Sequence, residues 1–421
     1  MAVAERTVTD ICLTARAAAR LLAGMGSKVK DAALLGIASA LEARTPEILE
    51  ANARDVEGGR VAGLSPALLD RLTLDRARVR AMAEGARAIA ALRDPVGEVV
   101  EGFRLPNGLD VRKVRVPLGV VAVVYEARPN VTIDAAALAL KSGNAVVLRG
   151  SSSAVHSNAV LAAVAAQAAE EAGVPAGALA LVAGGGREEL AELATRTGVV
   201  DLIIPRGGEG LKAALSAVAT VPVIYAASGN CHVYVDATAD LEAATAIAVN
   251  AKVQRPGMCN AAETLLVHRD IAPEFLPRAL AALADEGVEL RGDDTTRALA
   301  GDVDVRAADA ADWATEFLAL VLAVRVVDSL EEAIEHVTAY GSGHSEAIVT
   351  RDTAAARAFS LGVDAACVYV NASTRFTDGG EFGMGAEIGN STQKLHARGP
   401  IGLRELCTTK YLVEGDGHVR P

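Results

Sequence analysis

Residues 120–149 read VVAVVYEARPNVTIDAAALALKSGNAVVLR, two short apolar runs with a helical segment between them. The runs VVAVVY and AVVLR are apolar at consecutive positions rather than at every second position. Such continuous runs are typical of strands that are buried on both faces of a parallel sheet. Residues 133–141 have the spacing of a helix, so this stretch predicts one strand–helix–strand unit.

Further runs of the same kind follow, ALALVA, DLIIP and VPVIYA, with helical patterns over residues 157–171 and 207–218. A second region of alternating strands and helices begins at about residue 229 and ends near CVYVNASTRF, residues 367–376. Strands alternating with helices predict an α/β fold with doubly wound parallel sheets, the arrangement typical of nucleotide-binding proteins. The sequence contains no GxGxxG motif, so this prediction depends on the pattern alone.

One glycine-rich stretch, PRGGEG, directly follows a predicted strand and opens a predicted helix. Backbone amides at the start of a helix can bind a pyrophosphate, although such a loop is often only a tight turn. The candidate cofactor-binding residues here are Pro205, Arg206, Gly207 and Gly208.

Composition limits the classes of function. A chain of 421 residues suggests two or three domains, and 51% hydrophobic residues predict a well-filled globular core. The formal net charge of −12 argues against nucleic-acid and anionic membrane partners. The five cysteines include no CxxC pair and the seven histidines have no metal-ligand spacing, so neither a disulfide framework nor a metal site is expected. A cytoplasmic protein that acts on small molecules is the expectation.

Before residue 94 the alanine and leucine spacing predicts helices, of which Pro46 and Pro66 each open one. Residues 99–118 then predict an exposed β-hairpin, with Asn107 and Gly108 supplying the positive φ angles of its turn. An exposed hairpin edge can pair with another chain, or it can be an ordinary surface feature.

Cys259 is the candidate nucleophile. It lies in VQRPGMCNAAETLLVH, after Pro256 and Gly257, which interrupt regular structure. If residues 260–263 form a helical turn, backbone N–H groups would favour the thiolate. The alternative is that Cys259 is a small buried hydrophobic residue.

VQRPGMCNAAETLLVH, together with GNCHVYVD before it and AIEHVTAYGSGHSEAI after it, resembles the glutamate-5-semialdehyde dehydrogenase (gamma-glutamyl phosphate reductase) family of the aldehyde dehydrogenase superfamily. The likeness extends from about residue 112 to residue 411. It implies an aldehyde dehydrogenase-like fold in three parts. These are an NADP(H)-binding domain, a catalytic domain, and an oligomerisation hairpin with its tail, expected at residues 1–98 and 119–228, 229–390, and 99–118 and 391–421.

The resemblance also implies roles for single residues. Cys259 matches the catalytic thiol, and the side-chain amide of Asn130 the oxyanion hole. Arg149 with Ser151 is expected to bind the 2′-phosphate of NADPH, and Glu316 the nicotinamide ribose. Without the resemblance, Asn130 would be read as a turn residue, Arg149 as a solvated strand end and Glu316 as an exposed charge.

The activity implied is reduction of L-glutamyl 5-phosphate by NADPH through a thioester on Cys259, the second step of proline biosynthesis. Two alternatives stay open, a hydrolytic aldehyde dehydrogenase and a catalytically silent protein of the same fold. Hydrolytic members carry a glutamate where this chain has Ser228, which favours the reductase.

The resemblance further implies a homo-oligomer (dimer or tetramer) and functional coupling to glutamate 5-kinase. The sequence does not identify the groups that bind the amino and carboxylate ends of the glutamyl substrate. Arg128, Arg375 and Lys394 are hypotheses for them, and His232 and His344 are either pocket residues or structural ones.

Overall fold

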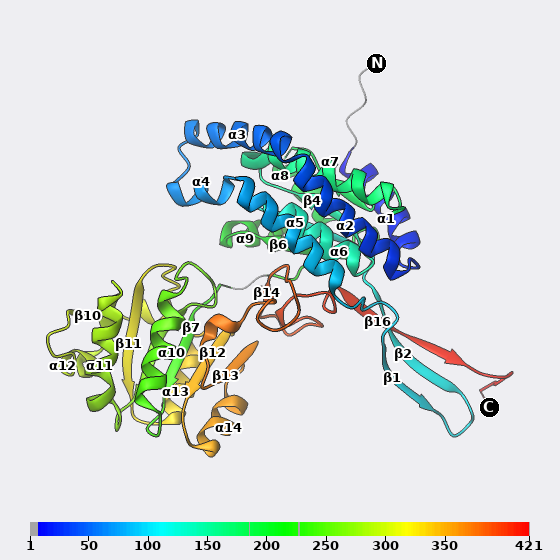
Figure 1. Ribbon diagram of the computed structural model, residues 1–421. Helices are drawn as coiled ribbons and strands as arrows, with labels where there is room; N and C mark the ends of the chain where they lie inside the picture. The colour runs from blue at the N-terminus through cyan, green and yellow to red at the C-terminus, as the bar shows by residue number, and fades with distance from the viewer. Residues whose placement is uncertain (1–6, 185, 226–227, 421) are drawn as a thin grey trace. The chain divides into compact units, whose positions relative to one another are not determined.

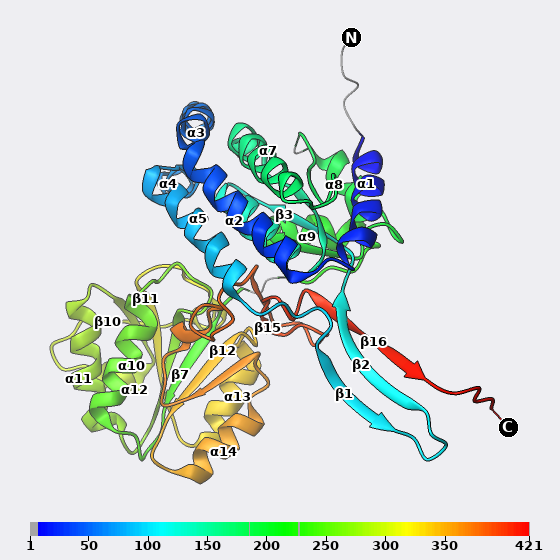
Figure 2. The same cartoon turned by 45° about the vertical axis from the view of Figure 1, so that its right-hand side comes forward.

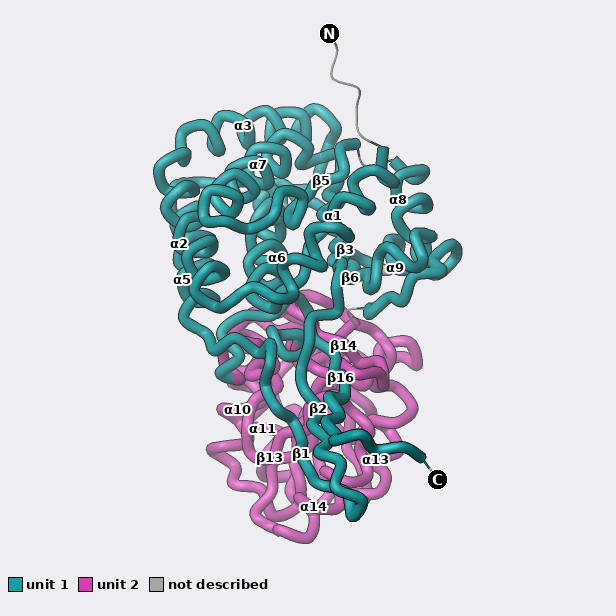
Figure 3. The backbone as a smooth tube through the Cα atoms, turned by 90° about the vertical axis from the view of Figure 1, so that its right-hand side faces the viewer, with its two compact units in different colours: residues 1–225, 383–389, 401–421 teal, residues 226–382, 390–400 magenta. Residues whose placement is uncertain are grey.

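A computed structural model of the protein describes residues 7–184, 186–225 and 228–420 (Figure 1). The chain divides into two compact units (Figure 3). Unit 1 comprises residues 1–225, 383–389 and 401–421, and unit 2 comprises residues 226–382 and 390–400. Both units alternate helices and parallel strands, which confirms the predicted α/β class. The roles assigned to the three predicted parts of the chain stay predictions.

Unit 1 is built on a parallel sheet of four strands in the order β5-β4-β3-β6. Every residue of β3 and β4 is buried, as the continuous apolar runs of residues 120–149 predicted. The strands are β3 (Val120–Tyr125), β4 (Ala145–Arg149), β5 (Leu179–Leu181) and β6 (Leu202–Arg206).

Alternate residues of these strands face different helices. Val120, Ala122 and Val124 pack against the first helix and the two helices that flank β6 in sequence. The opposite face of the sheet is covered by the helices that connect β3 to β4 and β4 to β5 (Figure 2). The flanking helices are α1 (Val8–Leu22), α6 (Asn130–Lys141), α7 (Val155–Glu171), α8 (Arg187–Ala194) and α9 (Glu209–Val218), with the 3-10 turn η1 (Ser152–Ala154) before α7.

The remaining N-terminal helices form an outer layer, in which α2, α3 and α5 pack on α6 and α7 and α4 packs on α3. They are α2 (Ser27–Ala43), α3 (Thr45–Val61), α4 (Pro66–Leu72) and α5 (Arg76–Ala91). Pro46 and Pro66 lie in the first turns of α3 and α4, as predicted. Proline fits there because the first N–H groups of a helix have no partner within it.

The run VPVIYA does not form the strand that its composition predicted. Residues 221–225 make only an isolated bridge, Val223 to Ile203, at the β6 edge of the sheet. The amide of Ile203 donates to the carbonyl of Pro222, but Pro222 itself has no N–H to offer. A proline within a short run therefore limits the ladder to one bridge.

The predicted hairpin is present. β1 (Val99–Arg104) and β2 (Asp110–Pro117) pair antiparallel, and β16 (Cys407–Glu414) adds a third strand on β2. The expected turn geometry is confirmed for Gly108, which has a positive φ of 95°, but it was wrong for Asn107, which does not have a positive φ. Pro106 favours an ordinary turn whose last residue is a left-handed glycine, and Gly108 N–H donates to the Leu105 carbonyl at 2.9 Å.

Unit 2 contains a parallel sheet of seven strands in the order β10-β9-β11-β8-β7-β12-β13. The strands are β7 (Cys231–Val235), β8 (Ala262–His268), β9 (Glu289–Gly292), β10 (Val305–Ala307), β11 (Val321–Val327), β12 (Ser345–Val349) and β13 (Cys367–Val370). A small antiparallel pair, β14 (Asn390–Ser391) and β15 (Gly399–Pro400), completes the unit.

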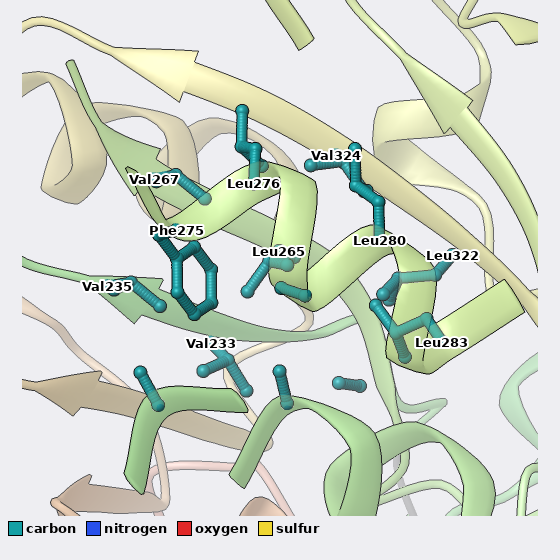
Figure 4. Close-up of a cluster of buried hydrophobic side chains, with 14 of the residues drawn as sticks. Val233, Val235, Leu265, Val267, Phe275, Leu276, Leu280, Leu283, Leu322 and Val324 are labelled. Atoms are coloured by element: carbon teal, nitrogen blue, oxygen red, sulfur yellow. The ribbon is translucent and has the colours of Figure 1, made fainter. Parts of the chain in front are cut away.

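Helices cover both faces of the unit 2 sheet. On one face, α11 places Phe275, Leu276 and Leu280 against Leu265 and Val324 of the strands (Figure 4). On the other face, α13 and α14 bury a second apolar cluster. The elements are α10 (Leu241–Val253), α11 (Ala272–Asp285), α12 (Asp294–Ala298), α13 (Leu330–Tyr340), α14 (Thr353–Gly362), and the 3-10 turns η2 (Asp312–Ala314) and η3 (Thr374–Phe376).

Among the described residues, no helix has both the length and the apolar character needed to cross a membrane.

Candidate active site

Cys259 lies in the loop that connects α10 to β8. The loop makes two successive turns, in which the amides of Met258 and Ala261 donate to the carbonyls of Arg255 and Met258. The helical turn considered for residues 260–263 is not formed, because β8 begins at Ala262. Cys259 is half-buried, whereas the other four cysteines are buried. It is therefore the most accessible thiol of the chain.

Two residues of the neighbouring strand segment fix the backbone of Cys259. A Cβ atom on Gly229 would lie 1.5 Å from the Cys259 carbonyl oxygen, so only glycine fits there. The Cys231 thiol, at the start of β7, donates to the same carbonyl oxygen at 3.2 Å. Burial raises the pKa of Cys231 well above its ordinary value, which keeps this second thiol protonated.

The residue after the nucleophile is anchored to a distant segment. Asn260 donates through Nδ2 to the carbonyls of Arg375 at 3.3 Å and Thr377 at 2.9 Å. Thr374 donates back to the Asn260 carbonyl at 2.7 Å. Asn371, with a φ of 56°, turns the chain at the carboxyl end of β13, so η3 lies beside the loop of Cys259.

Glu316 is brought close to the same loop. Its Oε1 accepts the N–H of Gly229 at 2.6 Å, and Gly229 in turn contacts Cys259. Two of the predicted site residues of unit 2, Cys259 and Glu316, are thus joined through one glycine. Whether Glu316 also holds a ribose stays a prediction.

A buried ion pair that the sequence reasoning missed supports the segment of Glu316. Lys252 and Glu263 are both fully buried, 2.5 Å apart, and Glu263 also accepts the N–H of Leu318 at 3.2 Å. Burial raises the pKa of Glu263 to about 7 and lowers that of Lys252. Leu318 has a φ of 53°, a strained conformation for leucine. The one sequence signal was a glutamate at the start of an apolar strand.

The two histidines proposed as pocket residues are fully buried. His232 contacts Glu346 through its backbone N–H at 2.7 Å and its Nδ1 at 3.0 Å. His344 contacts the Ser345 hydroxyl at 2.8 Å, and burial lowers its pKa to about 4. These contacts match the structural alternative for both residues.

In unit 1, Asn130 is the first residue of α6, directly after the turn that follows β3. Its Nδ2 donates to Asp134 at 3.1 Å, and burial raises the pKa of Asp134 to about 6. Asn130 belongs to unit 1 and Cys259 to unit 2. The expected oxyanion hole therefore stays a prediction.

Arg149 ends β4, on the strand next to β3. The side chain is largely buried, and its Nη2 donates to the Gly186 carbonyl at 2.7 Å. Ser151 follows it and caps η1, with its hydroxyl 2.8 Å from that of Ser153. A guanidinium and two hydroxyls thus follow one strand end, the group of donors that a 2′-phosphate requires.

The PRGG segment is where the structure adds a residue that the sequence reasoning missed. Pro205 and Arg206 end β6, and Gly208 precedes α9. The Gly208 amide donates to the Glu126 carboxylate at 3.1 Å, and a Cβ on Gly207 would lie 2.7 Å from the carboxyl carbon of Glu126. A carboxylate of the chain itself already contacts an amide expected to face a pyrophosphate.

No group of three or more His, Cys, Asp or Glu side chains in the described part of the chain is arranged to hold a metal ion.

The sequence matches the model of the aldehyde dehydrogenase family over residues 2–298 and 303–411. It is 57% identical over 416 residues to the gamma-glutamyl phosphate reductase of Thermobifida fusca, with 99% of each chain covered. It is 52% identical over 420 residues to that of Geobacter metallireducens, with 100% of each chain covered.

The structure is similar to the crystal structure of gamma-glutamyl phosphate reductase from Thermotoga maritima, with a TM-score of 0.96 and 45% identity over 99% of this chain and 100% of that one. An acetylating aldehyde dehydrogenase from Geobacillus thermoglucosidasius shares the fold at 20% identity, with a TM-score of 0.70 over 98% of this chain and 97% of that one. The expected aldehyde dehydrogenase-like fold is therefore confirmed. The chain belongs to the aldehyde dehydrogenase family and, within it, to the gamma-glutamyl phosphate reductases.

Proposed function

We propose that this protein reduces L-glutamyl 5-phosphate to L-glutamate 5-semialdehyde and phosphate, the second step of proline biosynthesis. The observation that carries the proposal is the half-buried Cys259 thiol, in a loop whose backbone is fixed at Gly229 and Asn260. Family membership supports the choice of substrate. A nucleophile held in one orientation gains rate because the cost of positioning is met by the fold.

The first half of the reaction belongs to Cys259. Its thiolate attacks the acyl carbon, a C–S bond forms, and the C–O bond to the phosphate breaks with its electron pair staying on the phosphate oxygen. The product is a thioester on Cys259. We assign the stabilisation of the tetrahedral oxyanion to the Asn130 amide and the backbone N–H of Cys259, donors of the type that such an intermediate requires.

The residues present fit a nicotinamide dinucleotide. Arg149 and Ser151 lie at the carboxyl end of β4, and Gly208 follows β6, the two strands that flank β3. The carboxyl ends of such strands are the usual place of a dinucleotide in a doubly wound sheet. The Gly208 amide would have to exchange its bond to Glu126 before it could bind a pyrophosphate. Arg149 would bind the 2′-phosphate, which favours NADPH over NADH, and Glu316 would hold the nicotinamide ribose. When bound, the cofactor supplies the hydride that reduces the thioester carbon. Cys259 then leaves as the thiolate.

Ser228, an exposed residue, stands where hydrolytic relatives carry a glutamate that activates water. Without that carboxylate, the thioester should resist water, and in the reverse direction phosphate must be the acceptor. We expect semialdehyde and NADP⁺ to give sustained NADPH formation only when inorganic phosphate is added. Steady oxidation to free glutamate without phosphate would favour a hydrolytic enzyme, and no turnover under either condition would favour a silent protein.

We also propose a homo-oligomer, dimer or tetramer, that assembles through the three-stranded sheet β1-β2-β16. β1 is exposed along its whole length and carries exposed apolar side chains at Val99, Val100 and Phe103. Such an edge strand invites pairing with a second copy. A monomer in sedimentation at micromolar concentration would contradict this.

Two further parts of the proposal rest on family membership alone. The substrate is a reactive acyl phosphate, so functional coupling to glutamate 5-kinase, which would supply it, is expected. A cytoplasmic location likewise stays a prediction.

A further inference from the structure

Two arginines lie beside the nucleophile. Arg255 precedes Cys259 in the same loop, and Arg375 lies in η3. The Arg375 side chain is anchored through Nε, which donates to the Gln254 side chain at 2.8 Å. Its backbone carbonyl accepts from Asn260, as described above. Arg375 is thus held by residues on both sides of Cys259 in the loop.

The guanidinium of Arg375 has unused donor capacity. Its Nη1 atom is buried and has no hydrogen-bond partner among the described residues. Over the same residues, neither Arg375 nor Arg255 forms an ion pair with a carboxylate. Leaving a buried charged donor unpaired is costly, so the Nη1 atom of Arg375 calls for a partner, which a bound anion would supply.

The charges around the loop indicate the sign and the magnitude of the charge on that ligand. Burial lowers the pKa of Arg375, and the positive charge of Arg255 lowers it further, whereas Cys259 and Asp378 act in the opposite direction. The two guanidinium groups and the Cys259 thiol are therefore close enough to interact electrostatically. Asp378 is near enough to act on Arg375 but forms no ion pair with it in the described part of the chain, and two cations kept close in this way suit an anion of more than one charge.

We propose that Arg375, with Arg255, binds the phosphate group of the acyl phosphate substrate and holds it as it leaves the acyl carbon attached to Cys259. This inference rests on the proposed function and deepens it. In the substrate the phosphate is joined through one oxygen to the carbon that Cys259 attacks. The α-carboxylate lies four carbon–carbon bonds further away.

Phosphate also fits the donors better than a carboxylate does. A guanidinium donates two parallel hydrogen bonds to phosphate oxygens, and a second arginine matches the second charge. The sequence had suggested Arg375 for an end of the glutamyl chain, with Lys394 and Arg128. Lys394 is paired with Asp364 at an exposed position, which leaves Arg375 as the residue tied to the nucleophile loop.

The steady-state test uses the reverse reaction with inorganic phosphate, semialdehyde and NADP⁺. In Arg375→Gln, the KM for phosphate should rise about 10- to 100-fold, the usual effect of losing a charged hydrogen-bonding partner. The KM for semialdehyde should stay within about twofold, because its carboxylate is not the ligand of Arg375. Arg375→Lys should recover part of the loss, since it restores charge without the two-pronged geometry.

Arg269→Gln is the matched control. Arg269 is exposed, pairs with Asp328, and is not among the charges that act on Arg375. The Arg269→Gln substitution removes one positive charge from the same unit, and it should leave the KM for phosphate and the KM for semialdehyde unchanged.

A second readout needs no turnover. Inorganic phosphate should slow the alkylation of Cys259 by iodoacetamide in the wild-type protein, relative to KCl of equal ionic strength. Arg375→Gln should lose this protection. If Arg375→Gln does not fold, Arg255→Gln is measured in its place, because Arg255 is exposed and should not affect packing.

A rise in the semialdehyde KM alone would assign Arg375 to the carboxylate, and an equal rise in both values would indicate a structural role. Either result overturns the proposal. A wild-type protein without phosphate-dependent oxidation would remove the proposed function, and the protection measurement would then decide the phosphate site by itself.

Discussion

The two units place their predicted site residues at opposite ends of their sheets. In unit 1, Arg149 is the last residue of β4, and Asn130 and Gly208 follow the carboxyl ends of β3 and β6. In unit 2, Cys259 and Glu316 precede the amino ends of β8 and β11. Ligands of doubly wound sheets usually bind at the carboxyl ends of the strands, so unit 1 follows the common pattern and unit 2 does not.

The two sheets also differ in the polarity of the side chains that they bury. In unit 1, β3 is apolar and fully buried. In unit 2, the amino ends of the central strands bury polar side chains, among them His232, Glu263, Ser345 and Glu346. Some of these side chains join the elements around the nucleophile loop, since Glu263 pairs with Lys252 of α10 and Ser345 contacts Thr377, whose carbonyl accepts from Asn260. We therefore expect substitutions in unit 2 to change chemistry and stability together, and substitutions at the strand ends of unit 1 to change mainly cofactor affinity.

The largest effect is expected for Cys259→Ser. Removing a nucleophile typically costs more than about 10³-fold in turnover, because serine is not ionised at neutral pH. NADPH affinity, measured by fluorescence titration, and the unfolding midpoint should stay close to those of the wild type. Undiminished turnover in this variant would show that Cys259 is not the nucleophile.

The same residue should be the fastest cysteine to react with iodoacetamide, as mass spectrometry of digested protein would show. Burial raises the pKa of Cys12 to about 11 and that of Cys407 to about 12, so these thiols resist alkylation. Faster labelling of either buried thiol would contradict the account.

Gly229→Ala tests the claim that chemistry and stability are joined in unit 2. The new methyl would meet the Cys259 carbonyl at 1.5 Å, so the loop must move. We expect a stability loss of about 1–3 kcal/mol and a loss of most activity. Gly58→Ala in α3, with nothing within 4 Å of its Cβ position, is the control and should be neutral or slightly stabilising. Equal behaviour of the two variants in denaturant unfolding would break the comparison.

Arg149→Ala tests unit 1. It should weaken NADPH binding about tenfold, the effect of one charged hydrogen-bonding pair, and NADH binding less. The rate of Cys259 alkylation should be unchanged. An equal loss with both cofactors in binding titrations would show that Arg149 does not distinguish them.

The smallest effect concerns pH. Burial lowers the pKa of His344 from 6.5 to about 4, so its contribution to stability is complete above pH 6.5 and is lost as the pH falls toward 4. His344→Asn should flatten the fall in unfolding free energy over this window by on the order of 1 kcal/mol. The raised pKa of Glu263 makes the unfolding free energy change with pH in the opposite direction. This contribution is the same in the wild type and in His344→Asn, so it cancels when the two curves are subtracted. Replacing the exposed His418 should leave the slope unchanged.

The sequence predicted what depends on local pattern. The apolar runs at residues 120–149 became β3 and β4, and Pro46 and Pro66 begin helices, because burial on both faces and missing N–H groups leave direct marks in the residue types. The run VPVIYA failed because one proline limited the pairing of a strand that composition alone favoured.

The contacts that hold the residues of the candidate site could not be predicted from local sequence pattern. The Lys252–Glu263 pair and the anchoring of Asn260 to η3 join residues that are distant in sequence or hidden in apolar segments. Likewise, nothing in EARPN indicated that Glu126 would contact the amide of Gly208. These contacts depend on how the sheets bring loops together, and a single sequence carries no direct record of that.

The most direct test of the central claim, that Cys259 carries a thioester protected from water, is a single-turnover measurement without phosphate. Semialdehyde and NADP⁺ are mixed with the protein in phosphate-free buffer, NADPH is followed, and the acid-quenched protein is digested for mass spectrometry. The account predicts at most one NADPH per chain, with the glutamyl group on Cys259, and release of the group when phosphate is added. Continued NADPH formation without phosphate, or an adduct on another residue, would contradict it.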